Sequence, residues 1–151
     1  MRLIQLFLLL TIFALTPACS SPGSGAATME RMPPVAEGEG RLVFYRPSSM
    51  AAALKPSIRV NDESVGTARS KTFLFINRPP GTYVVACSTL LEHSRSYNLS
   101  AGQTIYVKLT STVGLVAGHV IPSLANESTA QSSIKNLKYI GDPTLLTAAQ
   151  E

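Results

Sequence analysis

Residues 104–109 read Thr-Ile-Tyr-Val-Lys-Leu, the clearest alternation of apolar and polar side chains in the chain. Successive side chains of a β-strand point to opposite faces, so this period of two predicts a strand with one face in a core. A second stretch, residues 72–76, reads Thr-Phe-Leu-Phe-Ile and is apolar on both faces. That pattern is typical of a central strand covered on both sides. The two stretches together indicate a β-protein.

Further short runs of strand character lie on either side of these two, at residues 42–45, 57–61, 65–67, 83–89, 96–99 and 113–121. Gly, Pro, Asn and Asp separate several of these runs and favour tight turns. Seven or eight short strands with turns about every 8–12 residues predict a mainly β fold, namely a single two-sheet β-sandwich of the immunoglobulin-like or transthyretin-like kind. Ala130, Ile134 and Leu137 recur at helical spacing, which predicts one C-terminal helix over residues 126–139 covering an edge or end of the sandwich.

The N-terminus has the features of an export signal. Arg2 precedes an apolar run at residues 3–15, which is too short to cross a bilayer as a helix. The run ends in Leu15-Thr16-Pro17-Ala18-Cys19-Ser20, which resembles the lipobox of bacterial lipoproteins, although Thr16 stands where Leu is preferred. We therefore expect residues 1–18 to be a signal peptide and Cys19 to carry the lipid. The alternative is ordinary cleavage, which would give a soluble periplasmic protein.

The rest of the chain divides by composition. Residues 19–40 are rich in Gly, Pro, Ser and Ala without periodicity, which predicts a flexible linker behind the lipidated cysteine. Residues 41–141 form the predicted β-sandwich domain, and residues 142–151 are expected to be a loose tail. With Cys19 lipidated, Cys87 has no internal partner, and its place in the apolar run Tyr83-Val-Val-Ala-Cys87 predicts burial.

The composition argues against most chemistry. The chain has 151 residues, 15% charged residues, two His and two Cys. No spacing of His, Cys or Asp suggests a metal site, no Gly-rich loop suggests a phosphate cofactor, and the basic side chains, with a net charge of +4, are dispersed, so we expect neither cofactor nor nucleic acid. Cys87 with His93 or His119 is the one conceivable nucleophile–base pair, which would make the protein a cysteine-dependent hydrolase. No local signature supports it, and we expect no catalytic residues.

The most suggestive segment for binding is residues 46–56, Arg-Pro-Ser-Ser-Met-Ala-Ala-Ala-Leu-Lys-Pro, which joins two predicted strands. Connections usually lie on the surface, so its apolar centre either folds back onto the core or offers a contact patch. If it is a contact patch, we expect Arg46, Met50 and Leu54, with Arg78 nearby, to form the partner-binding surface.

Several motifs together resemble a bacterial envelope lipoprotein family that carries a small β domain of unknown function. The chain reads Arg41-Leu-Val-Phe-Tyr-Arg-Pro and then Val60-Asn-Asp-Glu-Ser-Val-Gly66, followed by Pro79-Pro-Gly and Leu99-Ser-Ala-Gly-Gln-Thr-Ile-Tyr106. In this order, the four segments are similar to that family's aromatic strand, its hairpin, its Pro-Pro-Gly turn and the Leu-x-Ala-Gly-x-x-Tyr segment that follows the turn. The resemblance implies a small β domain on a lipoprotein. It implies no catalytic residue in this chain.

Taken together, these features lead us to expect a non-catalytic lipoprotein with a membrane anchor that presents a binding module to the periplasm. Ser20 after Cys19, by resemblance to such lipoproteins, favours the outer membrane. The expected partner is an envelope protein or a cell-wall glycan. An accessory subunit of a secretion or envelope machine is the alternative, similar to the small transthyretin-like lipoproteins of such assemblies. The sequence does not identify an oligomeric state.

Overall fold

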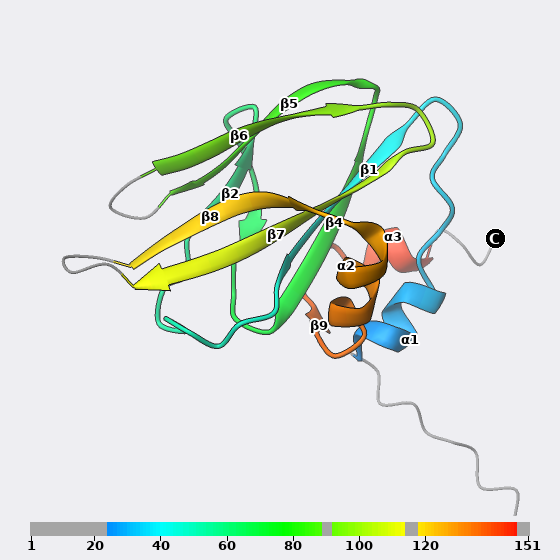
Figure 1. The fold of residues 1–151 in the computed structure, drawn as a ribbon. Helices are drawn as coiled ribbons and strands as arrows, with labels where there is room; N and C mark the ends of the chain where they lie inside the picture. Colours follow the sequence, from blue (N-terminus) through cyan, green and yellow to red (C-terminus); the bar gives the residue numbers. More distant parts are fainter. Residues whose placement is uncertain (1–23, 89–91, 114–117, 148–151) are drawn as a thin grey trace, which may run out of the picture.

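The computed structural model describes residues 24–88, 92–113 and 118–147, and it confirms the predicted β-sandwich (Figure 1). The five-stranded sheet has the order β8 (Gly118–Ala125), β7 (Thr104–Val113), β1 (Gly40–Arg46), β4 (Thr72–Arg78) and β9 (Lys138–Tyr139). The four-stranded sheet has the order β3 (Glu63–Thr67), β2 (Ser57–Val60), β5 (Gly81–Ser88) and β6 (Glu92–Leu99).

β1 lies at the centre of the larger sheet and sets the long axis of the domain. It pairs antiparallel with β4, so that Gly40 faces Arg78 at one end and Arg46 faces Thr72 at the other. It pairs parallel with β7. We call the end at Arg46 and Thr72 the lower end, because it lies towards the bottom of Figure 1, and the end at Gly40 and Arg78 the upper end.

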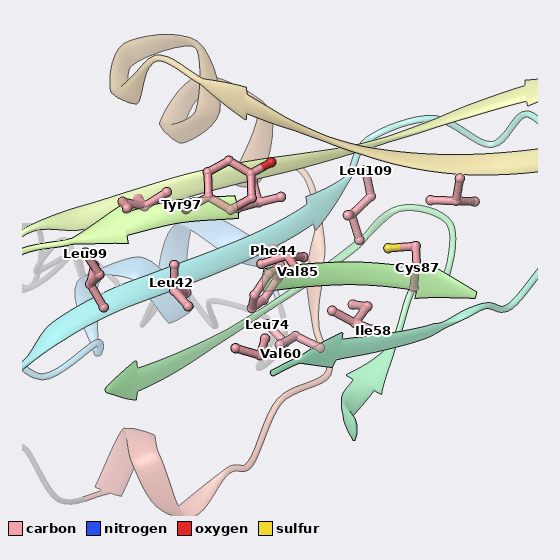
Figure 2. Packing of buried hydrophobic residues seen from close by; sticks show 14 residues of the cluster. Leu42, Phe44, Ile58, Val60, Leu74, Val85, Cys87, Tyr97, Leu99 and Leu109 are labelled. Carbon is pink, nitrogen blue, oxygen red and sulfur yellow. The ribbon is translucent and has the colours of Figure 1, made fainter. Parts of the chain in front are cut away.

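Both faces of the larger sheet are buried, as the apolar run at residues 72–76 predicts. Leu42, Phe44 and Leu74 point into the sandwich, where Figure 2 shows them packed against side chains of the smaller sheet. Val43, Tyr45, Phe73 and Phe75 point the other way, into a second apolar cluster under the helices. The alternation along β1 and β4 therefore serves two cores, and the helices form a third layer.

The expected flexible linker over residues 19–40 is wrong from Ser24 onwards. α1 (Gly25–Glu30) follows Ser24, whose side chain accepts a hydrogen bond from the Ala27 amide at 3.4 Å. Its first turn lies directly on the chain that follows α2, with Ala26 N donating to Lys135 O at 3.1 Å. Gly25 makes this approach possible, because a Cβ there would lie 1.8 Å from Ile134 O. A helix of six residues is not stable alone, so packing is what orders it.

The C-terminal predictions also need correction. α2 (Glu127–Ile134) begins at the N-cap Asn126 but ends five residues before Tyr139 and covers a face of the larger sheet rather than an edge. It stops because Lys138 and Tyr139 pair with β4 as β9. The expected loose tail contains α3 (Thr144–Thr147), which is held by the 7% exposed Leu146.

The apolar stretch at residues 113–121 was expected to be one strand, and this is wrong. β7 extends to Val113 and β8 begins at Gly118, so the two strands form an antiparallel pair that runs from Tyr106↔Ala125 to Val113↔Gly118. No helix in the three described segments is long and apolar enough to span a membrane.

Candidate functional site

Arg46, the last residue of β1, is buried inside the domain and is only 1% exposed. Its guanidinium donates five hydrogen bonds: Nε to Ser111 Oγ at 2.9 Å, Nη1 to Leu54 O and Ala68 O at 2.7 Å each, and Nη2 to Met50 O at 3.0 Å and Ala51 O at 2.8 Å. A guanidinium has five N–H donors, so every one is used. Burial lowers the pKa of Arg46, and neutral oxygens rather than a carboxylate surround its charge.

This arrangement changes the expected role of Arg46. A side chain that is 1% exposed and has no free donor cannot contact a partner directly. Three of its acceptors, the carbonyl oxygens of Met50, Ala51 and Leu54, belong to the loop at residues 47–56. Arg46 is therefore the residue that positions this loop, and the loop itself is what a partner could meet.

The loop at residues 47–56 both packs on the domain and exposes apolar surface. Leu54 is half-buried and lies against the start of β8, where a Cβ on Gly118 would be 2.5 Å from Leu54 Cδ1. Met50 is 55% exposed, and Ala52 and Ala53 are also exposed. Leu54 therefore folds back onto the domain, whereas Met50 faces solvent, and the contact patch stays a prediction.

Arg78 does not lie beside this loop. It pairs with Gly40 at the upper end of β1, six residues from the Arg46↔Thr72 pair at the lower end. At about 3.4 Å per residue, the two ends are about 20 Å apart. The expectation that Arg46, Met50, Leu54 and Arg78 form one surface is therefore wrong. They mark two opposite ends of the domain.

A polar cleft of about 500 Å³ surrounds Arg78 at the upper end. We call it the Arg78 cleft; its lining includes Glu39, Glu63, Asn77, Asp142 and Leu145. Arg78 Nη2 donates to Glu63 Oε2 at 2.9 Å. Hydrogen bonds from the Thr144 hydroxyl and amide lower the pKa of the Asp142 carboxyl below its usual value. The cleft thus contains three carboxylates and one guanidinium that already has a partner.

Cys87 lies in the core, as the sequence predicts. It is 1% exposed, and its sulfur points into the cluster of apolar side chains in Figure 2. Burial raises the pKa of the thiol to about 12, which the positive charge of Arg46 only partly opposes. A thiolate is the reactive form of cysteine, so a thiol in this state is a poor nucleophile at neutral pH.

The two histidines meet at the side of the sandwich where β6 approaches β8. The ring centroids of His93 and His119 are 5.3 Å apart in an edge-to-face arrangement, and His93 is the cross-strand partner of Cys87. In residues 24–88, 92–113 and 118–147 no group of three or more His, Cys, Asp or Glu side chains could hold a metal ion. Because His93 lies on β6 and His119 on β8, each an edge strand of its sheet, the contact between the two rings joins the sheets at their edges.

The comparison with protein families gives one match. A family model described as protein of unknown function (DUF2846) matches residues 36–120, more than half of the chain. The chain belongs to the DUF2846 family. Neither a curated protein nor a solved structure matches. The DUF2846 match includes β1 to β7 and the loop at residues 47–56, and it ends in β8, before α2 and β9.

Two features of this DUF2846 protein were missed at the sequence level. The Arg78 cleft includes residues from the chain before β1, from β3, from β4 and from the segment around α3, and no local pattern links these segments. The five hydrogen bonds of Arg46 likewise join residues far apart in the chain. The one available signal was the apolar loop between Pro47 and Pro56, directly after a strand that ends in arginine. Cys19 lies outside the described residues.

Proposed function

We propose that the protein is a non-catalytic lipoprotein of the bacterial envelope, anchored through Cys19, which binds a partner in the Arg78 cleft. The observation that carries the proposal is the position of Ser24, the first residue that the structure describes. Ser24 follows Cys19 by five residues and pairs with Lys138, which in turn pairs with Thr72 at the lower end. The chain therefore enters the domain at the end opposite the Arg78 cleft.

This geometry favours a lower end near the membrane and an upper end that is free to bind a partner. Five residues span at most about 18 Å, so a lipid on Cys19 holds the lower end close to the bilayer. The cleft lies a further 20 Å or so away along β1 and faces the periplasm. We propose the outer membrane as the location, because Ser20 rather than Asp follows Cys19.

The chemistry of the cleft favours a basic protein segment as its ligand. Glu39, Glu63 and Asp142 outnumber the single guanidinium of Arg78, which Glu63 already neutralises. The hydrogen bonds from Thr144 that lower the pKa of Asp142 favour the ionised form of its carboxyl group. Opposite charge across an interface raises the association rate and the specificity more than it raises the affinity itself. A lysine- or arginine-rich segment of an envelope protein is therefore the ligand we propose.

The experiment compares the mature protein with the double variant Glu39→Gln/Glu63→Gln, which keeps the shape of the cleft and removes two charges. Glu92→Gln/Glu127→Gln makes the same change in net charge at residues that do not line the cleft. We expect the cleft variant to lose at least tenfold in affinity for an oligolysine peptide and the control variant to lose less than twofold. Equal losses in both variants would refute the cleft as the site.

The same variants distinguish the partner classes in native membranes. Chemical cross-linking of envelopes, followed by mass spectrometry, is expected to give a protein partner that the cleft variant loses and the control keeps. A stoichiometric complex would identify the protein as an accessory subunit of an envelope machine. Cleft-dependent co-sedimentation with purified cell wall, without a protein partner, would instead identify a glycan binder and contradict the basic-segment proposal.

A further inference from the structure

The lower end of the domain carries a group of exposed basic side chains, which we call the basic end: Lys55, Arg69, Lys71, Lys135 and Lys138. They come from three connections that are far apart in sequence, at residues 47–56, 68–71 and 135–138. In Figure 1 the β1–β2 connection, β9 and the start of α1 all lie towards the bottom of the view. The expectation that the basic side chains are simply dispersed therefore misses a local concentration.

Hydrogen bonds join these connections into one surface. Lys138 N donates to Lys71 O at 3.0 Å, which joins the last connection to the middle one. Arg46 Nη1 donates to both Ala68 O and Leu54 O, which joins the middle connection to the loop that ends in Lys55 and Pro56. The Ala68 amide also donates to Pro56 O at 2.8 Å. These bonds hold the backbone of the three connections together, so the five cationic side chains project from one surface.

Three carboxylates of the described residues lie at the opposite end. Glu39, Glu63 and Asp142 line the Arg78 cleft at the upper end. Glu37 precedes β1 at the end of Gly40, and Glu127 follows β8, whose last residue, Ala125, is level with Val43 in the middle of β1. Asp62 and Glu92 both lie against Arg59, and Glu30 ends α1. Three carboxylates thus line the cleft at the upper end, and five exposed cations lie at the lower end, where the nearby Glu92 is paired with Arg59.

The anchored N-terminus enters at the basic end. Ser24 forms a bridge to Lys138, and the Ala26 amide donates to Lys135 O, so two of the five cations flank the point of entry. The segment between Cys19 and Ser24 spans at most about 18 Å, roughly two Debye lengths at physiological ionic strength. A lipid on Cys19 therefore confines the cations to the layer of water where a charged bilayer surface attracts them.

We infer that the basic end rests on anionic phospholipid headgroups of the bilayer that holds the lipid anchor, with Met50 directed at the interface. This inference rests on the proposed lipidation of Cys19. The cations supply attraction to phosphate, and the exposed apolar tip of the loop at residues 47–56 supplies a side chain that gains by leaving water. Docking fixes the orientation of the domain, so that the Arg78 cleft faces away from the membrane.

The test measures contact between the loop and lipid in the full mature protein, isolated from membranes and reconstituted into vesicles. The variant Met50→Cys receives an environment-sensitive fluorophore. Labelling is specific because Cys87 is buried and Cys19 carries the lipid. Vesicles of phosphatidylcholine alone are compared with vesicles in which about one third is phosphatidylglycerol. We expect a blue shift and quenching by lipid-borne quenchers in the anionic vesicles only.

Matched variants test the role of charge. Lys71→Glu/Lys138→Glu reverses two charges at the basic end, and Arg31→Glu/Arg95→Glu makes the same net change at exposed residues outside both the basic end and the Arg78 cleft. Each basic residue near an anionic surface raises the ratio of docked to free domain about fivefold, so the first pair is expected to lower that ratio by about 25-fold or more. The second pair is expected to change it by less than twofold. A fluorophore on Glu37→Cys, at the upper end, is expected to stay in water.

The outcomes separate this inference from the proposed function. A protein that has no acyl group and does not float with vesicles would refute the anchor. A protein that floats while the Met50 probe stays in water would refute the docking and leave the anchor intact. Contact that is equal in both kinds of vesicle, or equal losses in both charge variants, would also refute the docking.

Discussion

Replacement of Arg46 tests the organisation of the domain. In Arg46→Met the side chain keeps most of its length and loses all five donors. Two acceptors, Ala68 O and Ser111 Oγ, are buried, and each costs about 1–3 kcal/mol when it loses its partner. The carbonyl oxygens of Met50, Ala51 and Leu54 are only partly buried, so water can replace part of what they lose.

The expected net loss in the free energy of unfolding is about 3–5 kcal/mol. This figure is smaller than the sum of five lost bonds, because the native protein carries the cost of removing a guanidinium from water. Against a typical stability of about 5–15 kcal/mol, such a loss is large. Arg46→Lys keeps the charge but offers three donors without the planar fork, so we expect it to lose about 2 kcal/mol.

The assay is urea unfolding followed by circular dichroism, with Arg95→Met as the control. Arg95 is exposed on β6, and its replacement is expected to change the stability by less than about 0.5 kcal/mol. Hydrogen exchange adds a local measurement, because the Leu54 amide donates to Ala51 O inside the loop. Protection of that amide is expected to disappear in Arg46→Met. A loss below about 1 kcal/mol, with the amide still protected, would refute the positioning role.

Two further predictions concern packing and titration. Gly25→Ala places a Cβ 1.8 Å from Ile134 O, so α1 is expected to detach at a cost of about 2 kcal/mol in the free energy of unfolding. Hydrogen exchange at residues 26–31 is then expected to become faster. Unchanged exchange would contradict the packing described for α1. Burial in the folded protein raises the pKa of the Cys87 thiol from 9.0 to about 12, because the apolar core favours the neutral form. The free energy of unfolding is therefore expected to fall as the pH rises from about 9 to 12. Relative to Cys87→Ala, the native protein is expected to lose a few kcal/mol over that range, and parallel curves for the two proteins would contradict the burial of the thiol.

The sequence predicted the strands well where two cores enforce their pattern. The alternation at residues 104–109 and the apolar run at residues 72–76 correspond to β7 and β4, because side-chain direction in a strand follows directly from the period of two. The ends of elements were predicted less well. Lys138 and Tyr139 continue the helical pattern of α2 but pair with β4 instead, and a local pattern cannot show a bond to a strand 66 residues earlier.

The N-terminal helix escaped prediction for a different reason. Gly, Ala and Ser at residues 20–27 have the composition of a linker, yet the absence of a side chain at Gly25 is what lets the chain pack against Ile134. Small residues allow close packing as readily as flexibility, and only the tertiary structure distinguishes the two. This bears on the proposed anchor, because five residues rather than about twenty separate Cys19 from the first described residue of the domain.

The candidate site could be predicted only in parts. Arg46, Met50 and Leu54 do belong to one structural unit, because the loop follows the strand directly in the chain. Arg78 was grouped with them without a local pattern to support it, and the register of β1 and β4 places it at the opposite end. The basic end could not be found from sequence, since it forms only when three distant connections meet.

The lipid anchor is tested most directly by the intact mass of the mature protein from membranes, with and without Cys19→Ser. We expect a native protein that begins at Cys19 and carries acyl groups, and a variant that lacks them and leaves the membrane. A native protein with a free N-terminus and no lipid would contradict the anchor, and with it the membrane-facing position of the basic end.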